Sequence, residues 1–152
     1  MEATSLLKKD HKAVKQLFKE YEKTGDRAFE KKKAIFGKVK TELEIHSAIE
    51  EEIFYPAVKR ARSEEAKDTV REAVEEHSVV KFLLEQLSDM DPEEEQFDAK
   101  FEVLRENVEH HADEEEDEMF PQARKHLSDS QLEELGARME ARKESLKADA
   151  AA

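Results

Sequence analysis

The chain has 152 residues, and its 39 acidic side chains outnumber its 26 basic ones, which gives a formal net charge of −13. That charge argues against nucleic-acid binding, because a protein that binds phosphate backbones needs a basic surface. The sequence contains no cysteine, so disulfides and thiolate zinc sites are excluded. Three glycines and three prolines are too few turn residues for a sheet protein with many tight turns.

Apolar residues recur at helical spacing in four segments of about 20 to 35 residues each. The first residues of these helices are expected at or just after good capping residues: Thr4 or Ser5, Asp26, Ser63, and Asp91 with Pro92 after it. Pro56 is expected to bend the second helix or to end its regular part. The connections are short, so the fold class predicted is all-α, an up-down-up-down four-helix bundle.

A short fifth helix is predicted at about residues 129–147, with Ser130 as its N-cap and Glu133 completing a capping box. The bundle itself would cover about residues 5–125. No shift in composition and no long linker divides the sequence, so residues 1–152 are expected to form a single domain. We see no apolar leader or membrane-spanning run, and we therefore expect a cytoplasmic protein without membrane contacts.

Histidine replaces an apolar residue once in the core stripe of each long helix. These residues are His11, His46, His77 and His111, and the second and fourth helices add Glu50 and Glu115 one turn later. A histidine and a glutamate four residues apart lie on one face of a helix. Burying a carboxylate without a partner costs several kcal/mol. Six such groups in one layer therefore need a shared partner, and a pair of divalent cations would supply it.

A repeat strengthens the metal-binding interpretation. The strings His46-Ser-Ala-Ile-Glu50 and His111-Ala-Asp-Glu-Glu115 both read HxxxE, and each is followed by an aromatic residue and a proline ten residues after its histidine. A further histidine precedes each string, by 35 residues in one case and 34 in the other. The chain is thus two helical hairpins of one design. The alternative, ordinary core histidines beside solvated glutamates, does not explain this repeat.

At these residues the sequence resembles the hemerythrin-like family, also called the HHE cation-binding domain. The pattern H…HxxxE…H…HxxxE and the segments 46–56 and 111–121 carry the resemblance, which covers residues 5 to about 125. It implies a non-haem centre of two iron ions, joined by an oxo or hydroxo group. The four histidines would be terminal ligands, and Glu50 and Glu115 would bridge the ions. Zinc or manganese are possible substitutes for iron.

The sequence departs from the oxygen-carrying hemerythrins in two places. Ala73 stands four residues before His77, where those proteins have a second histidine. Glu115 follows His111 at the fourth position, where those proteins have an aspartate at the fifth, a position that Glu116 takes here. Fewer histidine ligands imply more open coordination positions, which favour chemistry on a bound small molecule over reversible oxygen carriage.

Two functions remain open at this point. The first is a di-iron protein that binds or reacts with O₂, peroxide or nitric oxide in stress response or sensing, with or without enzymatic turnover. The alternative is a non-catalytic module that stores, buffers or senses iron or zinc. In either case we expect a small diatomic or peroxide molecule, or the metal itself, as partner. We expect the protein to be a monomer or a weak dimer.

The remaining candidates receive modest roles. His110 and His126 are expected at the surface, and Glu114 and Glu118 are candidates for extra ligands or orienting groups. Glu51 and the acidic run 113–118 are otherwise expected to be solvated. The tyrosines are candidate hydrogen-bond donors, although packing at the edge of the core is favoured for them. The residues expected to form a dry wall beside the ligands are Phe18, Phe54, Phe101 and Met119.

Overall fold

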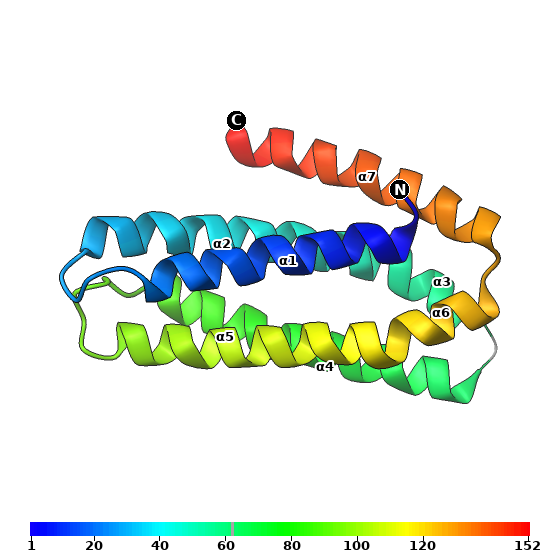
Figure 1. The fold of residues 1–152 in the computed structure, drawn as a ribbon, viewed down its shortest axis with the longest axis horizontal. Coiled ribbons are helices and arrows are strands. Elements are labelled where there is room, and N and C mark those ends of the chain that lie inside the picture. The colour runs from blue at the N-terminus through cyan, green and yellow to red at the C-terminus, as the bar shows by residue number, and fades with distance from the viewer. Residues whose placement is uncertain (62) are drawn as a thin grey trace.

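The structure is a computed structural model that describes residues 1–61 and 63–152, and this part of the chain is helical with short connections and no strand. Four long helices lie side by side, and a fifth lies outside them, across the first two (Figure 1). The long helices are α1 (Ala3–Glu22), α2 (Phe29–Ile49), α4 (Glu64–Ser88) and α5 (Phe97–Glu114), and the outer helix is α7 (Asp129–Ala151). The all-helical class predicted from the sequence is confirmed.

Two short π-helical segments follow the long helices α2 and α5. They are η1 (Glu50–Phe54) and η2 (Glu115–Met119), and they lead into α3 (Tyr55–Lys59) and α6 (Phe120–His126). The N–H of Tyr55 donates to the carbonyl of Glu50, five residues earlier, and Phe120 does the same to Glu115. A proline follows each aromatic residue and has no N–H for an α-helical bond, so the wider turn just ahead of it costs less. The regular helix thus ends before Pro56, as predicted.

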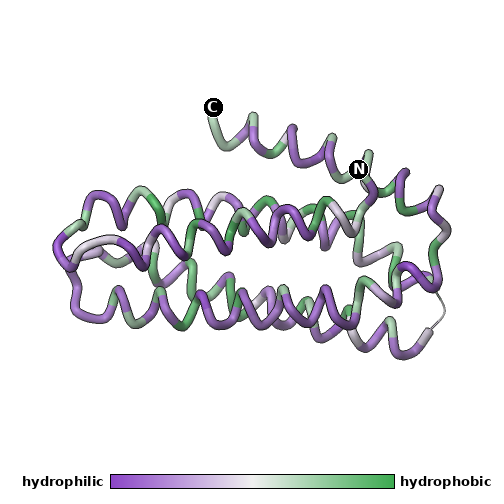
Figure 2. Tube along the Cα trace, in the orientation of Figure 1, coloured by the Kyte–Doolittle hydropathy of each residue, from purple (hydrophilic) through white to green (hydrophobic). Residues whose placement is uncertain are grey.

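Two apolar clusters fill the interior, one on each side of the histidine layer. One is built from α1, α2, α4 and α5 and contains Phe18 and Phe101. The other is built mainly from α1, α3, α4 and α7, with residues of the two π segments and α6, and contains Phe54 and Met119. All four of these side chains are buried, as expected for a dry wall. Hydrophobic and hydrophilic portions alternate along the long helices (Figure 2), as expected for helices that each bury one face.

Several helix boundaries differ from the prediction. Ser63 caps α4 as expected, its Oγ accepting from the N–H of Ala66 at 3.3 Å. Asp91 and Pro92 do not begin the fourth helix, which starts only at Phe97. The Asp91 carboxylate accepts instead from the N–H of Glu93 at 3.0 Å, within a turn. The first two helices are preceded by Glu2 and Ala28 rather than by Thr4, Ser5 or Asp26.

The C-terminal helix also differs from the prediction. Its N-cap is Ser128, and Gln131 completes the capping box, in place of Ser130 and Glu133. The helix continues to Ala151 and is 23 residues long, so it is not the short helix ending near residue 147. It contacts α1, α2 and η1. In the described part of the chain, no helix has the length and apolar character that crossing a membrane requires.

A pair of glycine substitutions tests how closely α7 packs on the start of α1. A Cβ at Gly136 would lie 2.1 Å from the carbonyl oxygen of Met1, whereas a Cβ at the exposed Gly37 would meet no described atom within 4 Å. Gly136→Ala should therefore lower the free energy of unfolding by about 1–3 kcal/mol. Gly37→Ala, within α2, should raise it by up to about 1 kcal/mol. Urea unfolding measures both, and effects of equal sign would contradict the close packing.

Candidate metal centre

The structure brings together all six residues that the sequence selected as ligands. The histidines come one each from α1, α2, α4 and α5, and the two glutamates are the first residues of η1 and η2. All six side chains are buried, and Glu50 and Glu115 are only 0% and 2% exposed. The repeat in the sequence therefore corresponds to one layer of polar groups between the two apolar clusters.

The six side chains form two overlapping groups of four. One contains His11, His46 and both glutamates, and the other contains His77, His111 and both glutamates. Within each group the potential ligand atoms lie within 4.8 Å of one another. Because Glu50 and Glu115 belong to both groups, each carboxylate is placed to contact two cations at once.

The Nε2 atom of every histidine points at a glutamate oxygen. In the first group, Nε2 of His11 lies 3.1 Å from Glu115 Oε1, and Nε2 of His46 lies 3.1 Å from Glu50 Oε1. The second group repeats this pattern: the first histidine of the hairpin again faces the glutamate of the other hairpin, and the second histidine faces the glutamate of its own. There Nε2 of His77 lies 3.1 Å from Glu50 Oε1, and Nε2 of His111 lies 3.2 Å from Glu115 Oε2.

Unpartnered atoms show that this layer fits metal ions. Within residues 1–61 and 63–152, Oε2 of Glu50 and Nδ1 of His77 are buried without a hydrogen-bond partner, and so is Nε2 of His46, whose 3.1 Å contact with Glu50 Oε1 lacks hydrogen-bond geometry. Nε2 of His77 also faces Nε2 of His111 at 3.1 Å, a contact between two nitrogens that are both suited to bind a metal ion. Buried polar atoms are rarely left unpaired in proteins. Imidazole and carboxylate donors suit first-row metal ions, and a cation between them would satisfy Nε2 of His46 and Oε2 of Glu50.

In the metal-free protein, neighbouring acids favour the protonated form of two of the histidines. Burial opposes charge on the histidines, but Glu50 and Asp10 hold the pKa of His46 well above its usual value. In the same way Glu115 and Glu76 outweigh burial and raise the pKa of His111 to about 10. Metal binding must displace these protons, because a ligating histidine is neutral.

A carboxylate also faces the outer ring nitrogen of each histidine. Nδ1 of His46 lies 3.0 Å from Asp10, Nδ1 of His11 2.8 Å from Glu116, Nδ1 of His111 2.7 Å from Glu76, and Nδ1 of His77 3.3 Å from Glu51. The contacts of His46, His11 and His111 are hydrogen bonds, which fix the tautomer and the orientation of a ligating ring, whereas Nδ1 of His77 only lies near Glu51. Glu51 is exposed as predicted and Glu116 is partly exposed, but each also contacts a candidate ligand, a role that the sequence did not assign to them.

A signal for these four carboxylates was present in the sequence. An acid stands directly before the first histidine of each hairpin, namely Asp10 and Glu76. Another acid stands directly after each buried glutamate, namely Glu51 and Glu116. In space, the first pair contacts the second histidine of its own hairpin, and the second pair contacts the first histidine of the other hairpin. The outer contacts thus share the twofold pattern of the ligands.

Tyr55 lies inside the site, contrary to the favoured expectation that it packs at the edge of the core. Its hydroxyl donates to Oε2 of Glu115 and lies 3.2 Å from Nε2 of His77 and 3.4 Å from Nε2 of His111. Burial and the charges of both glutamates raise the pKa of Tyr55 well above its usual value, so the hydroxyl keeps its proton. At the equivalent position Phe120 stacks on His11, with ring centroids 6.0 Å apart. The two halves of the site therefore differ.

Removal of this hydroxyl should be measurable in the metal-free protein. Tyr55→Phe removes the hydroxyl donor from a buried carboxylate oxygen of Glu115, so we expect the free energy of unfolding to fall by about 1–3 kcal/mol. Tyr21→Phe is the matched control, because the Tyr21 hydroxyl donates to Asp98, a residue whose side chain is mostly exposed. Urea unfolding in the presence of a chelator compares them. A Tyr55→Phe protein as stable as the Tyr21→Phe protein would contradict the role assigned to this hydroxyl.

The other candidates lie outside the buried layer. His110 pairs with Glu114 at 3.1 Å on the surface, where its side chain is 68% exposed. With Glu76 these two form a third, partly exposed group of possible ligands. Glu118 and His126 are exposed. The surface positions predicted for His110 and His126 are thus confirmed.

The match to known families settles which family this geometry represents. The model of the family described as hemerythrin, the hemerythrin HHE cation binding domain, matches residues 2–123. This chain belongs to that family. The resemblance drawn from the HxxxE repeat is confirmed, and the protein is a hemerythrin-like HHE domain with a buried histidine and glutamate cluster able to bind metal.

Individual relatives agree with the family assignment. The crystal structure of a hemerythrin HHE cation binding domain-containing protein from Mycobacterium kansasii matches with a TM-score of 0.86 and 30% identity, and the match covers 99% of this chain and 90% of that one. An uncharacterised protein of Mycobacterium tuberculosis is 32% identical over 150 residues, which is 97% of this chain and 88% of that protein. A DNA nickase from Nostoc is 31% identical over 94% of this chain, which spans 39% of the nickase.

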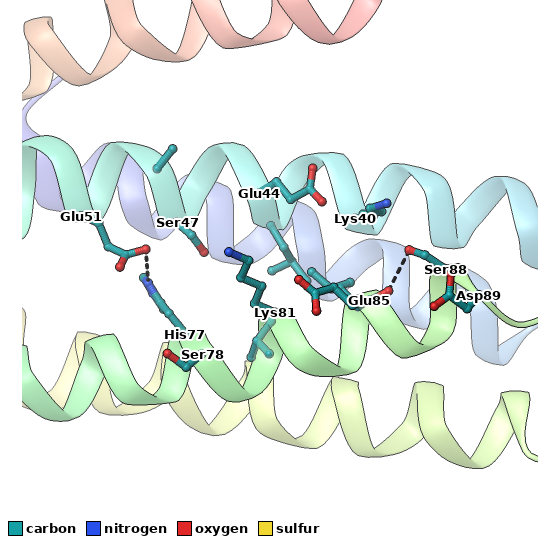
Figure 3. A pocket seen from close by; sticks show the side chains of 14 residues that line it. Lys40, Glu44, Ser47, Glu51, His77, Ser78, Lys81, Glu85, Ser88 and Asp89 are labelled. Atoms are coloured by element: carbon teal, nitrogen blue, oxygen red, sulfur yellow. Dashed lines mark hydrogen bonds and ion pairs between the residues drawn. The ribbon is translucent and has the colours of Figure 1, made fainter.

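Two hollows reach the centre of this HHE domain. A groove of about 710 Å³ runs between α2 and α4, with His77 and Glu51 at one end and Ser88 and Asp89 at the other (Figure 3). A much smaller cavity of about 30 Å³ touches all four histidines. Its remaining walls are largely apolar and include Val14, Leu43, Val80 and Val108.

Proposed function

We propose that this hemerythrin-like domain holds two iron ions in the buried layer and uses them to bind or react with O₂, peroxide or nitric oxide, in stress response or sensing. His11 and His46 would hold one ion, His77 and His111 the other, and both glutamates would bridge them. We further infer that the four long helices act as an up-down-up-down bundle around this centre. The sharing of Glu50 and Glu115 between the two groups of four is the observation that carries the proposal.

The size of the central cavity supports a small ligand. A volume of about 30 Å³ is enough for a water-sized molecule and too small for an organic substrate. All four histidines contact this cavity, and valine and leucine side chains supply much of the rest of its wall. An apolar wall keeps bulk water from the centre, which tunes the redox potential and protects a bound diatomic molecule.

Bound iron would supply one-electron redox chemistry at an open coordination position. The chain itself provides four Nε2 donors, held in orientation by the outer carboxylates. Tyr55 provides an O–H donor at Glu115, next to the His77 and His111 half of the site. The groove between α2 and α4 offers small molecules an approach to His77. Its charged lining has four acids against two lysines, which favours neutral molecules and cations over anions.

A non-catalytic function in storing, buffering or sensing iron or zinc is the second candidate. The observation in its favour is the donor set, since four imidazoles and two carboxylates accept zinc as readily as iron. The DNA-directed activity named for the Nostoc relative is not carried over to this chain. A net charge of −13 opposes binding to a phosphate backbone.

Metal loading with a visible spectrum separates the two functions. The protein purified with its native metal, or reconstituted with ferrous iron without air and then oxidised, should show charge-transfer bands of a bridged di-iron centre. These bands should change on addition of reductant, O₂, peroxide or nitric oxide. Zinc alone in the native protein, or iron that is colourless and inert to all four reagents, would contradict the redox function and favour storage or sensing.

A further inference from the structure

The C-terminal helix α7 lies outside the part of the chain that matches the family, and it contacts the elements that carry the candidate metal ligands. The family match ends at residue 123, whereas α7 covers residues Asp129–Ala151. The helix lies against α1, α2 and η1, the elements that carry His11, His46 and Glu50 (Figure 1). The two histidines on these elements, His11 and His46, belong to the same half of the site, whereas Glu50 is shared by both halves.

One side chain of α7 connects to a candidate ligand through a single residue. The Lys143 ammonium group donates to Oδ1 of Asp10, and Oδ2 of the same carboxylate lies 3.0 Å from Nδ1 of His46. Asp10 is only 3% exposed, and the Lys143 side chain is 16% exposed. The result is a continuous path, Lys143 to Asp10 to His46, in which Asp10 and His46 are buried and Lys143 is partly buried.

The equivalent carboxylate in the other hairpin has no such support. Glu76 takes the place of Asp10 and contacts Nδ1 of His111 at 2.7 Å, but its side chain is 24% exposed. In the described part of the chain its other close neighbours are His110 and Glu114 rather than a lysine or an arginine. The twofold pattern of ligands and outer carboxylates is thus broken at one point, and Lys143 is what breaks it.

We propose that Lys143 is a positioning residue that holds Asp10, and through it His46, in the orientation that binds metal, so that α7 sets the metal affinity of the His11 and His46 half of the site. This proposal rests on the proposed function, because it requires that the buried layer binds metal. A buried carboxylate with two fixed partners cannot turn away from His46 without losing one of them.

Loss of Lys143 leaves Asp10 with an unpaired oxygen and frees the His46 ring to rotate. Removing an outer partner of a metal ligand typically lowers metal affinity about 10- to 100-fold. We expect this loss for one of two bound ions, the one in the His11 and His46 half. The ion in the other half keeps its own outer carboxylates, Glu51 and Glu76, and should keep its affinity.

The test is zinc titration of the metal-free full chain in competition with a chromophoric chelator. Lys143→Met should weaken one of two zinc-binding steps about 10- to 100-fold, and Lys143→Arg should restore it. Arg142→Gln is the matched control: Arg142 is the preceding residue of α7 and bonds Glu52 at 2.8 Å in an exposed pair. Its two zinc-binding steps should equal those of the unmodified protein.

Asp10→Asn provides a second route, independent of the folding of the Lys143 variants. It should weaken the same zinc-binding step. The double variant Lys143→Met with Asp10→Asn should bind zinc in that step as tightly as Asp10→Asn alone, because both substitutions act on one path. Equal zinc affinities for the unmodified protein and Lys143→Met would overturn the proposal, as would equal losses in Lys143→Met and Arg142→Gln. An unmodified protein that binds no zinc and no iron would instead overturn the proposed function, and this inference with it.

Discussion

Glu115→Ala should cost the buried layer both of the metal ions that we propose it binds. Glu115 belongs to both groups of four and contacts His11 and His111 directly. Its removal deletes a ligand from each ion and leaves two imidazoles without the carboxylate that faces them. We expect metal affinity to fall about a hundredfold or more, by analogy with the 10- to 100-fold losses seen when even an outer partner is removed.

Stability should fall together with metal content. A metal that binds only the folded chain adds about 2.7 kcal/mol to stability at a concentration of one hundred times its dissociation constant. Elemental analysis and thermal unfolding, each with and without chelator, measure both effects. Glu118→Ala, an exposed acid of the same π segment, and His126→Ala, an exposed histidine, should change neither. Full metal content in Glu115→Ala, or metal loss in His126→Ala, would show that the ligand assignment is wrong.

The metal-free protein should become less stable as the pH rises above neutrality. The folded chain raises the pKa of His46 well above its ordinary value and that of His111 to about 10, against 6.5 for an unperturbed histidine. Between these values the folded state holds protons that the unfolded chain has released. The stabilising contribution is therefore complete below about pH 6.5 and is lost as the pH rises through about 10.

Metal affinity should follow the opposite trend. Each ion must displace protons from the histidines it binds, so the apparent affinity should increase with pH over the same interval. Urea unfolding in chelator, set beside zinc titration at matched pH values, gives both curves. Calorimetry in buffers of different ionisation heats counts the protons released. Metal-free stability that rises between pH 7 and pH 9, or metal binding without proton release, would contradict the proton-for-metal exchange.

The six ligand candidates could be predicted because they break a strong pattern twice. Each polar residue occupies a position where helical spacing required an apolar one, and the same break recurs in the second hairpin with the same spacing. His11, His46 and Glu50 therefore stood out without any knowledge of the fold. The register of four long helices then brought them together with their counterparts, since equivalent positions in equivalent hairpins meet at one level.

Tyr55 was misplaced because of a local change of helical pitch. Five residues make about 1.4 turns of α-helix, which directs Tyr55 away from the face of Glu50. In the π segment the hydrogen bond spans five residues, so Tyr55 comes back to that face after about one turn. A constant 3.6-residue period cannot show this. The proline after each aromatic residue was the visible sign of the change, and it was interpreted only as a bend or an end.

The outer carboxylates and the helix boundaries were missed for a different reason. With 39 acids in the chain, Glu51 and Glu116 were indistinguishable from solvated neighbours until contacts between hairpins were known. The boundaries depended on competition among several adequate caps. Ser128 with Gln131 forms both bonds of a capping box, and so displaces Ser130 by two residues.

Anomalous diffraction from crystals of the iron-loaded protein, collected on both sides of the iron edge, tests the central claim most directly. We predict two iron peaks between α1, α2, α4 and α5. Glu50 and Glu115 should bridge the peaks, one bound by His11 and His46 and the other by His77 and His111. A single peak, no peak, or iron at the partly exposed group of Glu76, His110 and Glu114 would contradict the claim.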